Sequence, residues 1–401
     1  MNVAEQIVTQ LVDAGVHRIY GIVGDSLNPI VDAVRKTGGS AQGGIDWIHV
    51  RHEEAAAFAA SAEAQLTGKL AVCAGSCGPG NLHLINGLYD ANRTGAPVLA
   101  IASHIPSVQI GSTYFQETHP DRVFEECSVY NELISSAAQS PRTVNSAIRH
   151  AVGLGGVAVI TLPGDITDLK AVEHVPTYAP ARPATLTPNP ADIDEAAALL
   201  NKANKVAIFA GAGVEGAHDE VIALADALKA PIGHSLRGKH FIQYDNPFDV
   251  GMTGLLGYGA AAEGMNDADV LILLGTDFPY DQFLPDTPTI QVDTHAEKLG
   301  RRTDVGLAIH AQVKPFIEAL LPHLRAGRSD SFLKAKIKKH SEIMHAPVGA
   351  YTRNVEKMRP IHPEYAAHLL NETAAKDAIF TADTGMCNVW TARYIDPLGT
   401  R

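Results

Sequence analysis

The sequence predicts an α/β protein whose domains are doubly wound around parallel sheets. Apolar runs of strand length alternate with helical patterns, first up to residue 162 and again from residue 191. The runs are continuously apolar, as in parallel strands covered by helices on both faces. The candidate strands of the first block are residues 18–23, 45–50, 70–75, 97–102, 132–136 and 156–162. Those of the second block are residues 205–210, 231–236, 269–275, 289–293 and 306–310.

Shifts in composition divide the chain into domains. A chain of 401 residues is long for one domain, and residues 175–190, rich in Pro, Ala and Thr, predict a linker. We therefore expect domains over residues 1–178 and 190–325, followed by a polar connecting helix and a third unit over residues 360–401. The third unit contains one candidate strand, residues 378–383, and the start of a helix, which is too little to bury a sheet. We expect this third domain to be incomplete.

The charge balance and the cysteine content exclude several classes of protein. The formal net charge is −12 and no run of Lys and Arg gives a basic face, so we expect no nucleic-acid partner. No apolar run approaches the roughly 18 residues that cross a bilayer. The chain opens in an amphipathic helix, residues 3–13, without a signal peptide, and its four cysteines suit a reducing compartment. These features predict a cytoplasmic protein.

A carboxylate stands where a short strand gives way to a helix. The candidate strand 45–50 is followed by Arg and His, and Glu53 and Glu54 then open an Ala-rich helical stretch. Taken alone, acidic residues at the start of a helix are explained by the helix dipole.

A glycine-rich turn joins another strand to a helix that carries a histidine. Residues 75–81 read Gly-Ser-Cys-Gly-Pro-Gly-Asn, and glycines such as Gly78 permit positive φ and let a flat ring approach the backbone closely. A tight strand–helix connection explains the same glycines. His83, on the helix that follows, is either a residue that faces a ligand or a histidine satisfied within the core.

These two motifs together resemble the pyrimidine-binding domain of thiamine-diphosphate enzymes. The sequence of these motifs is most similar to that of the pyruvate oxidases and pyruvate:quinone oxidoreductases, and the resemblance runs through all 401 residues. It implies that Glu53 hydrogen-bonds N1′ of the aminopyrimidine, where the proton favours the imino form that removes the C2 proton of the thiazolium. Such an acid needs a poorly solvated pocket, and Val50, Ala56 and Ala57 are consistent with one. The resemblance also implies that Gly78 lies by the pyrimidine and that His83 faces the substrate.

A third segment resembles the Phe-Gln pair of the same family. Residues 114–117 read Tyr-Phe-Gln-Glu, and the resemblance implies that Phe115 and Gln116 border the reaction centre as an apolar wall and a hydrogen-bond donor. An ordinary loop anchor is the alternative. Asp25 and Asp165 each follow a strand, and we interpret them as turn or N-cap residues.

A dinucleotide fingerprint opens the second domain. Gly211, Gly213 and Gly216 have the Gly-x-Gly-x-x-Gly spacing after a predicted strand, which alone predicts NAD binding. The next strand, however, ends in Ser-Leu-Arg-Gly-Lys, without the carboxylate that binds a ribose. Arg237 in that segment suits a 2′-phosphate, which leaves NADP as an alternative.

The resemblance favours FAD in this domain. In the family, loops at the ends of the strands line an extended FAD, glycines admit backbone N–H groups to the diphosphate and a cation adds charge. Asp293 is expected to accept hydrogen bonds from the adenosine part. The matching residues are Gly211, Gly213, Arg237, Gly251, Met252, Thr253, Gly254, Gly275, Thr276, Asp277, Phe278, Pro279 and Asp293.

The family's motif for Mg²⁺ and the cofactor diphosphate, Gly-Asp-Gly followed by Asn, is absent from the sequence. Residues 383–385, Asp-Thr-Gly, resemble the opening of the diphosphate-binding domain. We therefore expect the Mg²⁺ site beyond residue 401, no metal ligands within the chain, and a chain that is inactive alone.

The resemblance implies a FAD- and thiamine-diphosphate-dependent enzyme that decarboxylates pyruvate oxidatively to acetate and passes the electrons to a quinone. The alternatives are a phosphate-dependent pyruvate oxidase, a carboligase similar to acetohydroxyacid synthase, and a non-catalytic flavin-binding fragment. The resemblance further implies a homodimer or homotetramer. It also implies peripheral contact with the inner face of the cell membrane through a C-terminal tail.

Overall fold

The computed structural model describes residues 1–173 and 184–399. The chain divides into two compact units, Met1–Pro183 and Ala184–Arg401, which are described separately. Most of the expected linker, residues 175–190, lies outside the described residues. In the part of the chain that the structure describes, no helix is long and apolar enough to cross a membrane.

The first unit is a parallel six-stranded sheet with the strand order β2-β1-β3-β4-β6-β5. This confirms the predicted α/β class for the unit, although β5 begins two residues before the predicted strand. The strands are β1 (Arg18–Gly21), β2 (Asp46–His49), β3 (Ala71–Gly75), β4 (Val98–His104), β5 (Tyr130–Leu133) and β6 (Val157–Pro163). The helices are α1 (Val3–Asp13), α2 (Asn28–Lys36), α3 (Glu53–Thr67), α4 (Pro79–Leu82), α5 (Ile85–Thr94), α6 (Pro120–Val123), α7 (Ser140–Leu154) and α8 (Gly164–Thr167).

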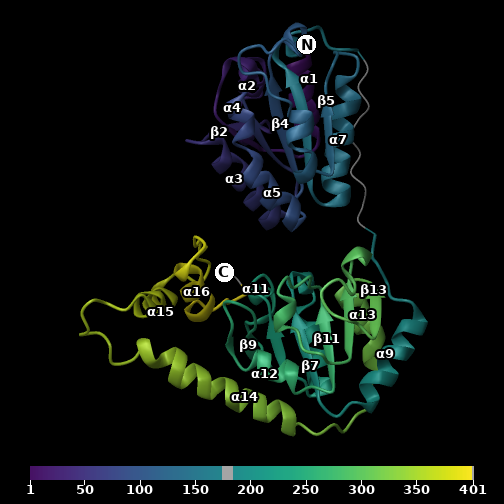
Figure 1. Ribbon diagram of the computed structural model, residues 1–401, viewed down its shortest axis with the longest axis vertical. Coiled ribbons are helices and arrows are strands. Elements are labelled where there is room, and N and C mark those ends of the chain that lie inside the picture. The colour runs from purple at the N-terminus through teal and green to yellow at the C-terminus, as the bar shows by residue number, and fades with distance from the viewer. Residues whose placement is uncertain (174–183, 400–401) are drawn as a thin grey trace. The chain divides into compact units, whose positions relative to one another are not determined.

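Helices cover both faces of this sheet (Figure 1). Successive strand residues point to opposite faces, so Val72 and Ala74 pack under α1, α2 and α7, whereas Ala71 and Cys73 pack under α3 and α5. The core between the sheet and helices α3 and α5 is built mainly from alanines. Small side chains let these two helices lie close to the sheet and to each other, which places the start of α3 at the carboxyl edge of the strands.

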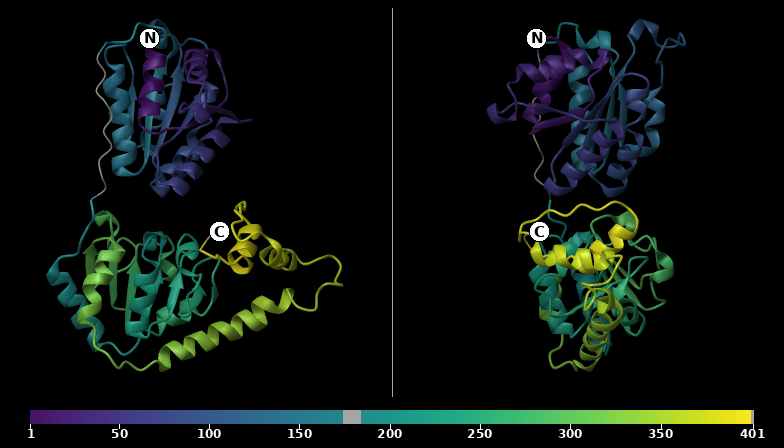
Figure 2. Two further views of the ribbon diagram at one scale, coloured as in Figure 1. Left: turned by 180° about the vertical axis from the view of Figure 1, so that it is seen from behind. Right: turned by 90° about the vertical axis from the view of Figure 1, so that its left-hand side faces the viewer.

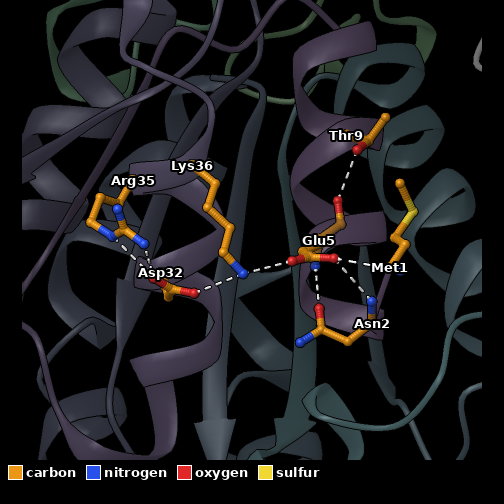
Figure 3. A network of polar contacts seen from close by, with 7 residues as sticks. All are labelled: Met1, Asn2, Glu5, Thr9, Asp32, Arg35 and Lys36. Atoms are coloured by element: carbon orange, nitrogen blue, oxygen red, sulfur yellow. Dashed lines mark hydrogen bonds and ion pairs between the residues drawn. The ribbon is translucent and has the colours of Figure 1, made fainter.

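A capping box fixes the start of α1 and joins it to α2 (Figure 3). The Asn2 side chain accepts the Glu5 N–H at 2.9 Å, and the Glu5 carboxylate accepts the Asn2 N–H at 3.2 Å. Lys36 of α2 lies 2.7 Å from Glu5 and 2.9 Å from Asp32. These side chains are largely solvent-exposed, so the ion pairs orient the two helices and add little to stability.

The second unit is a seven-stranded sheet with the order β10-β9-β8-β7-β11-β12-β13. All its pairings are parallel except that of β10 with β9. The strands are β7 (Val206–Ala210), β8 (Ile232–His234), β9 (Asp249–Met252), β10 (Tyr258–Gly259), β11 (Val270–Leu274), β12 (Thr289–Asp293) and β13 (Leu307–His310). The helices are α9 (Pro190–Lys202), α10 (His218–Leu228), α11 (Lys239–Ile242), α12 (Ala261–Asn266), α13 (Val313–Leu320), α14 (Ser331–Ile343), α15 (Pro363–Thr373) and α16 (Met386–Tyr394). Short 3₁₀ or π turns make up the remaining helical segments.

The six parallel strands lie in the sheet order β9-β8-β7-β11-β12-β13, which is the order 3-2-1-4-5-6 of a dinucleotide-binding fold. Helices α9, α10 and α13 bury one face of the sheet, and α12 with the aromatic residues after β11 buries the other. The five strands predicted in this domain are all present. The α/β prediction is therefore confirmed for both sheets.

Residues 251–254 are not the simple loop that we expected. Gly251 and Met252 end β9, and both pair with β10. Gly251 has φ +90°, and a Cβ there would lie 2.5 Å from the Tyr258 carbonyl oxygen. A glycine-containing strand of four residues, paired with a strand of two, lacks the continuous apolar run by which the other strands were predicted.

Helix α14 confirms the expected connecting helix, and the chain after it departs from prediction. Figure 2 shows α14, in yellow-green, running past the strands of this unit toward α15 and α16. The predicted strand at residues 378–383 is wrong, because the backbone there is assigned to no strand. A strand needs a neighbour for its backbone hydrogen bonds. Residues 378–383 belong to neither of the two sheets of the described chain.

The contact between α3 and α5 yields a stability prediction. A Cβ at Gly87 of α5 would lie 2.5 Å from the Ala57 Cβ and 2.6 Å from the Phe58 N, so Gly87→Ala should destabilise the first unit by about 1–3 kcal/mol. A Cβ at Gly153 of α7 would meet no heavy atom within 4 Å, so Gly153→Ala is the matched control and should stabilise by about 0.5–1 kcal/mol. Urea unfolding of both variants checks the opposite signs. Equal effects would contradict close helix packing at Gly87.

Candidate active site

The first unit has its topological switch point between β1 and β3, which lead to opposite halves of the sheet. In open α/β sheets, ligands bind outside the carboxyl ends of the strands at this point. Here the two turns are joined by hydroxyl groups. Ser26 Oγ lies 3.0 Å from Ser76 Oγ and accepts the Cys77 N–H at 3.0 Å. The glycine-rich turn predicted from the sequence is therefore held at the switch point.

Glu53 lies at the start of α3 with its side chain largely buried. Its exposed fraction is 7%, although it is an ionisable residue. His52 supplies the side-chain cap of α3, since its Nδ1 accepts the Glu54 N–H at 3.2 Å. The Glu53 Oε2 atom instead lies 3.0 Å from His83 Nδ1. Glu53 is thus turned toward the glycine-rich turn.

Two glycines leave space in front of this carboxylate. A Cβ at Gly80 would lie 3.2 Å from Glu53 Oε1, and a Cβ at Gly78, where φ is +70°, would lie 2.8 Å from the Gln116 Cβ. Side chains at these positions would fill the approach to the carboxylate. A buried acid beside an open backbone turn fits an aminopyrimidine, which needs a hydrogen-bonding acid and room for a flat ring.

His52, Glu53 and His83 bring together enough donor atoms for a metal ion, within 4.8 Å of one another. The rings of His52 and His83, however, are stacked, with centroids 4.3 Å apart and an interplanar angle of 27°. A histidine nitrogen binds a metal in the plane of its ring, and two stacked planes do not converge on a nearby point. One ring would have to turn before both could bind the same ion.

The loop after β4 carries the Phe-Gln pair to the same turn. Gln116 Oε1 lies 3.5 Å from Cys77 Sγ, and Gln116 has φ +64°. Phe115 is 77% exposed. The structure therefore brings Glu53, Gly78 and Gln116 around one turn, with His83 on Glu53, and leaves the ring of Phe115 largely in solvent.

Sequence reasoning missed His104 at this edge of the sheet. His104 ends β4 and is buried, and burial lowers its pKa. Its Nδ1 atom has no hydrogen-bond partner among the described residues. A polar residue at the end of a continuously apolar strand was the available signal.

We expected Asp165 to serve a turn or an N-cap, and of these two roles the N-cap is wrong. Its two carboxylate oxygens accept the backbone N–H and the hydroxyl of Ser107 at 2.7 and 2.6 Å. No side chain caps α8 at its N-terminus. The carboxylate instead accepts hydrogen bonds from the loop after β4.

In the second unit, the glycines of the fingerprint serve the packing of two turns. The Gly213 N–H donates to the Gly275 carbonyl at 2.9 Å. A Cβ at Gly211 would collide with the Gly275 carbonyl oxygen, and one at Gly275 would collide with the Gly213 Cα. The turns after β7 and β11 therefore meet backbone to backbone at the switch point, and these glycines are required whether or not a diphosphate binds.

Several residues that were predicted to bind the cofactor instead contact other side chains of the protein. Arg301 and Arg302 both pair with the Asp277 carboxylate. Phe278 is buried, edge-to-face with Phe209 at 5.1 Å between centroids, and a Cβ at Gly254 would lie 2.9 Å from its ring. The arginine pair was missed, although two adjacent arginines after a strand end were visible in the sequence.

Other predicted residues remain open to a ligand. Arg237 and Pro279 are exposed. Thr253 is buried, and its hydroxyl has no hydrogen-bond partner in the described part of the chain. Asp293 is buried at the end of β12, where it accepts the His295 N–H at 2.9 Å. Thr276 is also buried. A cation, an unsatisfied hydroxyl and a carboxylate are a donor set that fits a nucleotide, with Arg237 suited to the phosphates.

A cavity of about 510 Å³ lies elsewhere in this unit. Its lining residues are Gly216, His218, Asp219, Glu220, His240, Phe241, Tyr244, Lys314 and Gly399. None of the residues predicted to bind FAD is among them. The cavity is therefore not the predicted cofactor site.

The fold and the two switch points are those of a cofactor-binding α/β enzyme. Residues 1–123 match the family described as thiamine pyrophosphate enzyme, N-terminal TPP binding domain, and residues 193–320 match thiamine pyrophosphate enzyme, central domain. The chain is 37% identical to the putative thiamine pyrophosphate-containing protein YdaP of Bacillus subtilis, over 98% of this chain and 67% of that protein. The chain therefore belongs to the thiamine pyrophosphate enzyme family.

The chain is also similar to an uncharacterized protein, to a pyruvate oxidase and to acetolactate synthases. The chain is 54% identical to an uncharacterized 42.6 kDa protein encoded in the isoamylase 3′ region of Pseudomonas amyloderamosa, over 83% of this chain and 84% of that protein. It is 30% identical to the pyruvate oxidase of Lactiplantibacillus plantarum, over 95% of this chain and 63% of that enzyme. Acetolactate synthases match at 27–29% identity. The chain thus spans less than two thirds of that pyruvate oxidase.

A buried lysine follows the Arg237 turn and ties it to the end of the described chain. Lys239 is 8% exposed, and its Nζ donates to the Ile395 carbonyl at 2.8 Å and to the Gln243 side chain. Burial lowers its pKa to about 8, against the opposing effect of the carboxylates of Asp396 and Asp249. The charged form is therefore less stable in the folded protein than in the unfolded chain.

This shift predicts a pH dependence of stability. Between pH 8 and the ordinary lysine pKa of 10.5, the unfolded chain binds more protons than the folded protein, so stability rises with pH in this window. Relative to Lys239→Met, the wild-type free energy of unfolding should increase by up to about 1.4 kcal/mol per pH unit. Guanidinium unfolding at several pH values measures the difference. Lys334→Met, at an exposed lysine of α14, is the control, and a matching pH dependence in both comparisons would contradict the assignment.

Proposed function

We propose that this chain forms the aminopyrimidine-binding and flavin-binding parts of a pyruvate oxidoreductase. The enzyme decarboxylates pyruvate to acetate and passes the two electrons through FAD to a quinone. Membership of the thiamine pyrophosphate enzyme family and the likeness to a pyruvate oxidase support this proposal. The observation that carries it is the buried Glu53 carboxylate facing the Gly78–Gly80 turn.

Glu53 is the residue proposed to hydrogen-bond the protonated ring nitrogen of the aminopyrimidine. Its burial and its 3.0 Å contact with His83 keep it oriented toward the space above the turn. There it holds a proton on the ring nitrogen of the pyrimidine. Bound thiamine diphosphate supplies a carbon nucleophile for the keto carbon of pyruvate and holds the electron pair that remains when CO₂ leaves.

Other residues of the first unit shape the space around the substrate. His83 and Gln116 bring hydrogen-bonding groups to the side of the turn, and Phe115 provides an apolar surface once substrate covers it. Mg²⁺ and the cofactor diphosphate are expected at a site beyond residue 401. In the proposed dimer or tetramer, this site is expected to come from the partner subunit.

The second unit is proposed to hold FAD, which accepts the two electrons. Arg237 is proposed to bind the phosphates, and Thr253 and Asp293 the nucleoside, because these side chains retain free donors or acceptors. Passage of electrons to a quinone is consistent with a peripheral contact at the inner face of the cell membrane.

A carboligase of the acetolactate synthase type is the second candidate. The identities of 27–29% to acetolactate synthases nearly equal the 30% to the pyruvate oxidase, so overall similarity does not separate the two reactions. Anaerobic addition of pyruvate separates them, because an oxidoreductase bleaches its flavin and forms acetate or acetyl phosphate, whereas the carboligase forms acetolactate. The requirement for phosphate distinguishes the two oxidases.

The role of Glu53 yields a prediction on turnover. In the full-length protein with thiamine diphosphate, Mg²⁺ and FAD present, Glu53→Gln should lower pyruvate turnover by about 10²–10⁴, the usual contribution of a positioned proton-transfer group. The amide keeps the shape of the side chain, so thermal stability should change little. Glu54→Gln is the matched control and should keep its turnover. Near-normal turnover in Glu53→Gln would assign Glu53 to helix stabilisation alone.

The flavin proposal yields a prediction on colour and content. The purified protein should be yellow and release FAD on denaturation, because the second unit retains a cation, a hydroxyl and a carboxylate at its switch point. Arg237→Ala should weaken FAD binding by about tenfold, the effect of losing one charge-assisted hydrogen bond. Arg325→Ala removes a cation away from the switch point and is the control. A colourless protein that takes up NADPH and not FAD would contradict the proposal.

A further inference from the structure

The loop between β4 and α6, residues 105–119, is organised around a carboxylate. Glu117 accepts the backbone N–H of Gly111 at 2.5 Å and that of Tyr114 at 3.1 Å. The Glu117 N–H in turn donates to the Tyr114 carbonyl at 2.8 Å, which closes the turn that contains Phe115 and Gln116. One side chain therefore binds both ends of the loop tip.

The loop tip adopts a backbone conformation that needs such support. Thr113 and Gln116 have φ of +58° and +64°, in the left-handed region that is unfavourable for non-glycine residues. Tyr114, whose N–H binds Glu117, directly follows Thr113. The hydrogen bonds that the Gly111 and Tyr114 N–H groups donate to the charged Glu117 carboxylate offset this cost.

The two ends of the loop are tied to the sheet by other groups. Asp165 holds Ser107 at the beginning of the loop. At its end, Thr118 Oγ1 lies 3.5 Å from Asn81 Oδ1, and Asn81 Nδ2 donates to the Ser103 carbonyl at 2.8 Å. The tip between these anchors is solvent-exposed, and Glu117 is the charged group within it.

We propose that Glu117 is a positioning residue, which holds the tip so that Gln116 lies against Gly78 and Cys77 in the candidate site. The hydrogen bond from the Gly111 N–H is the main reason that the pKa of Glu117 is lowered, so the residue is ionised and a strong acceptor at neutral pH. Without it the tip loses its left-handed turn, and Gln116 leaves the Gly78 turn. That this placement serves a 2-oxo acid rests on the proposed function.

Cys77 reports the placement directly, because its thiol lies 3.5 Å from Gln116 Oε1. The rate of alkylation of Cys77 by iodoacetamide, followed by peptide mass spectrometry, should rise about fivefold to tenfold in Glu117→Ala, the factor for losing a hydrogen bond of ordinary net strength. Glu117→Gln keeps one acceptor oxygen and should show an intermediate rate. Glu125→Gln removes a neighbouring exposed carboxylate and should leave the rate unchanged. Cys387, in the second unit, is the internal reference.

Turnover provides the second readout. Glu117→Ala should lower kcat for pyruvate more than it raises KM, with partial rescue in Glu117→Gln, since Gln116 is expected to act on the reacting substrate. An unchanged rate of Cys77 alkylation in both Glu117 variants would overturn the inference, whatever the turnover. If Cys77 responds as expected and the full-length protein does not turn over pyruvate, the proposed function fails and the positioning role stands.

Discussion

The burial of the Glu53 carboxylate at the start of α3 constrains the architecture of the first unit. Removing a carboxylate from water costs several kcal/mol unless other groups take the place of the solvent. Glu53 meets this cost with one histidine and the open backbone of the Gly78–Gly80 turn. The turn must therefore approach α3 closely, which in turn requires the small residues of α3 and Gly87 of α5. Helix spacing, turn chemistry and the candidate site are consequences of this one placement.

The two units use glycines at their switch points for different physical ends. In the first unit, Gly78 and Gly80 leave space that a side chain would fill beside a functional group. In the second unit, Gly211, Gly213 and Gly275 allow two turns to touch, and the backbone of each turn fills the space that a side chain of the other would need. A Gly-x-Gly-x-x-Gly pattern thus indicates a switch point in both the structural and the functional interpretation. Ligand binding in the second unit must be judged from Arg237, Thr253 and Asp293 instead.

The sheets were predictable from sequence because each long strand is buried on both faces and therefore apolar throughout. The weakly marked elements were not, since β9 and β10 depend on a tertiary pairing around Gly251, and residues 378–383 form no strand despite an apolar stretch. Glu53, Gly78 and Gln116 were identified through a resemblance to a known family. The Glu53–His83 contact, the ion pairs of Asp277 and the burial of Phe278 depend instead on tertiary distances that no local sequence pattern encodes. His104, Glu117 and the arginine pair escaped notice because their roles arise from neighbours far along the chain or from backbone groups.

The central claim is that Glu53 receives the aminopyrimidine of thiamine diphosphate in front of the Gly78–Gly80 turn. A crystal structure of the full-length protein with thiamine diphosphate and Mg²⁺ tests it most directly. The account predicts a Glu53 carboxylate oxygen within hydrogen-bonding distance, about 2.6–3.2 Å, of the pyrimidine N1′ atom, with the ring against the turn. A pyrimidine ring bound elsewhere, with Glu53 still paired only to His83, would contradict it.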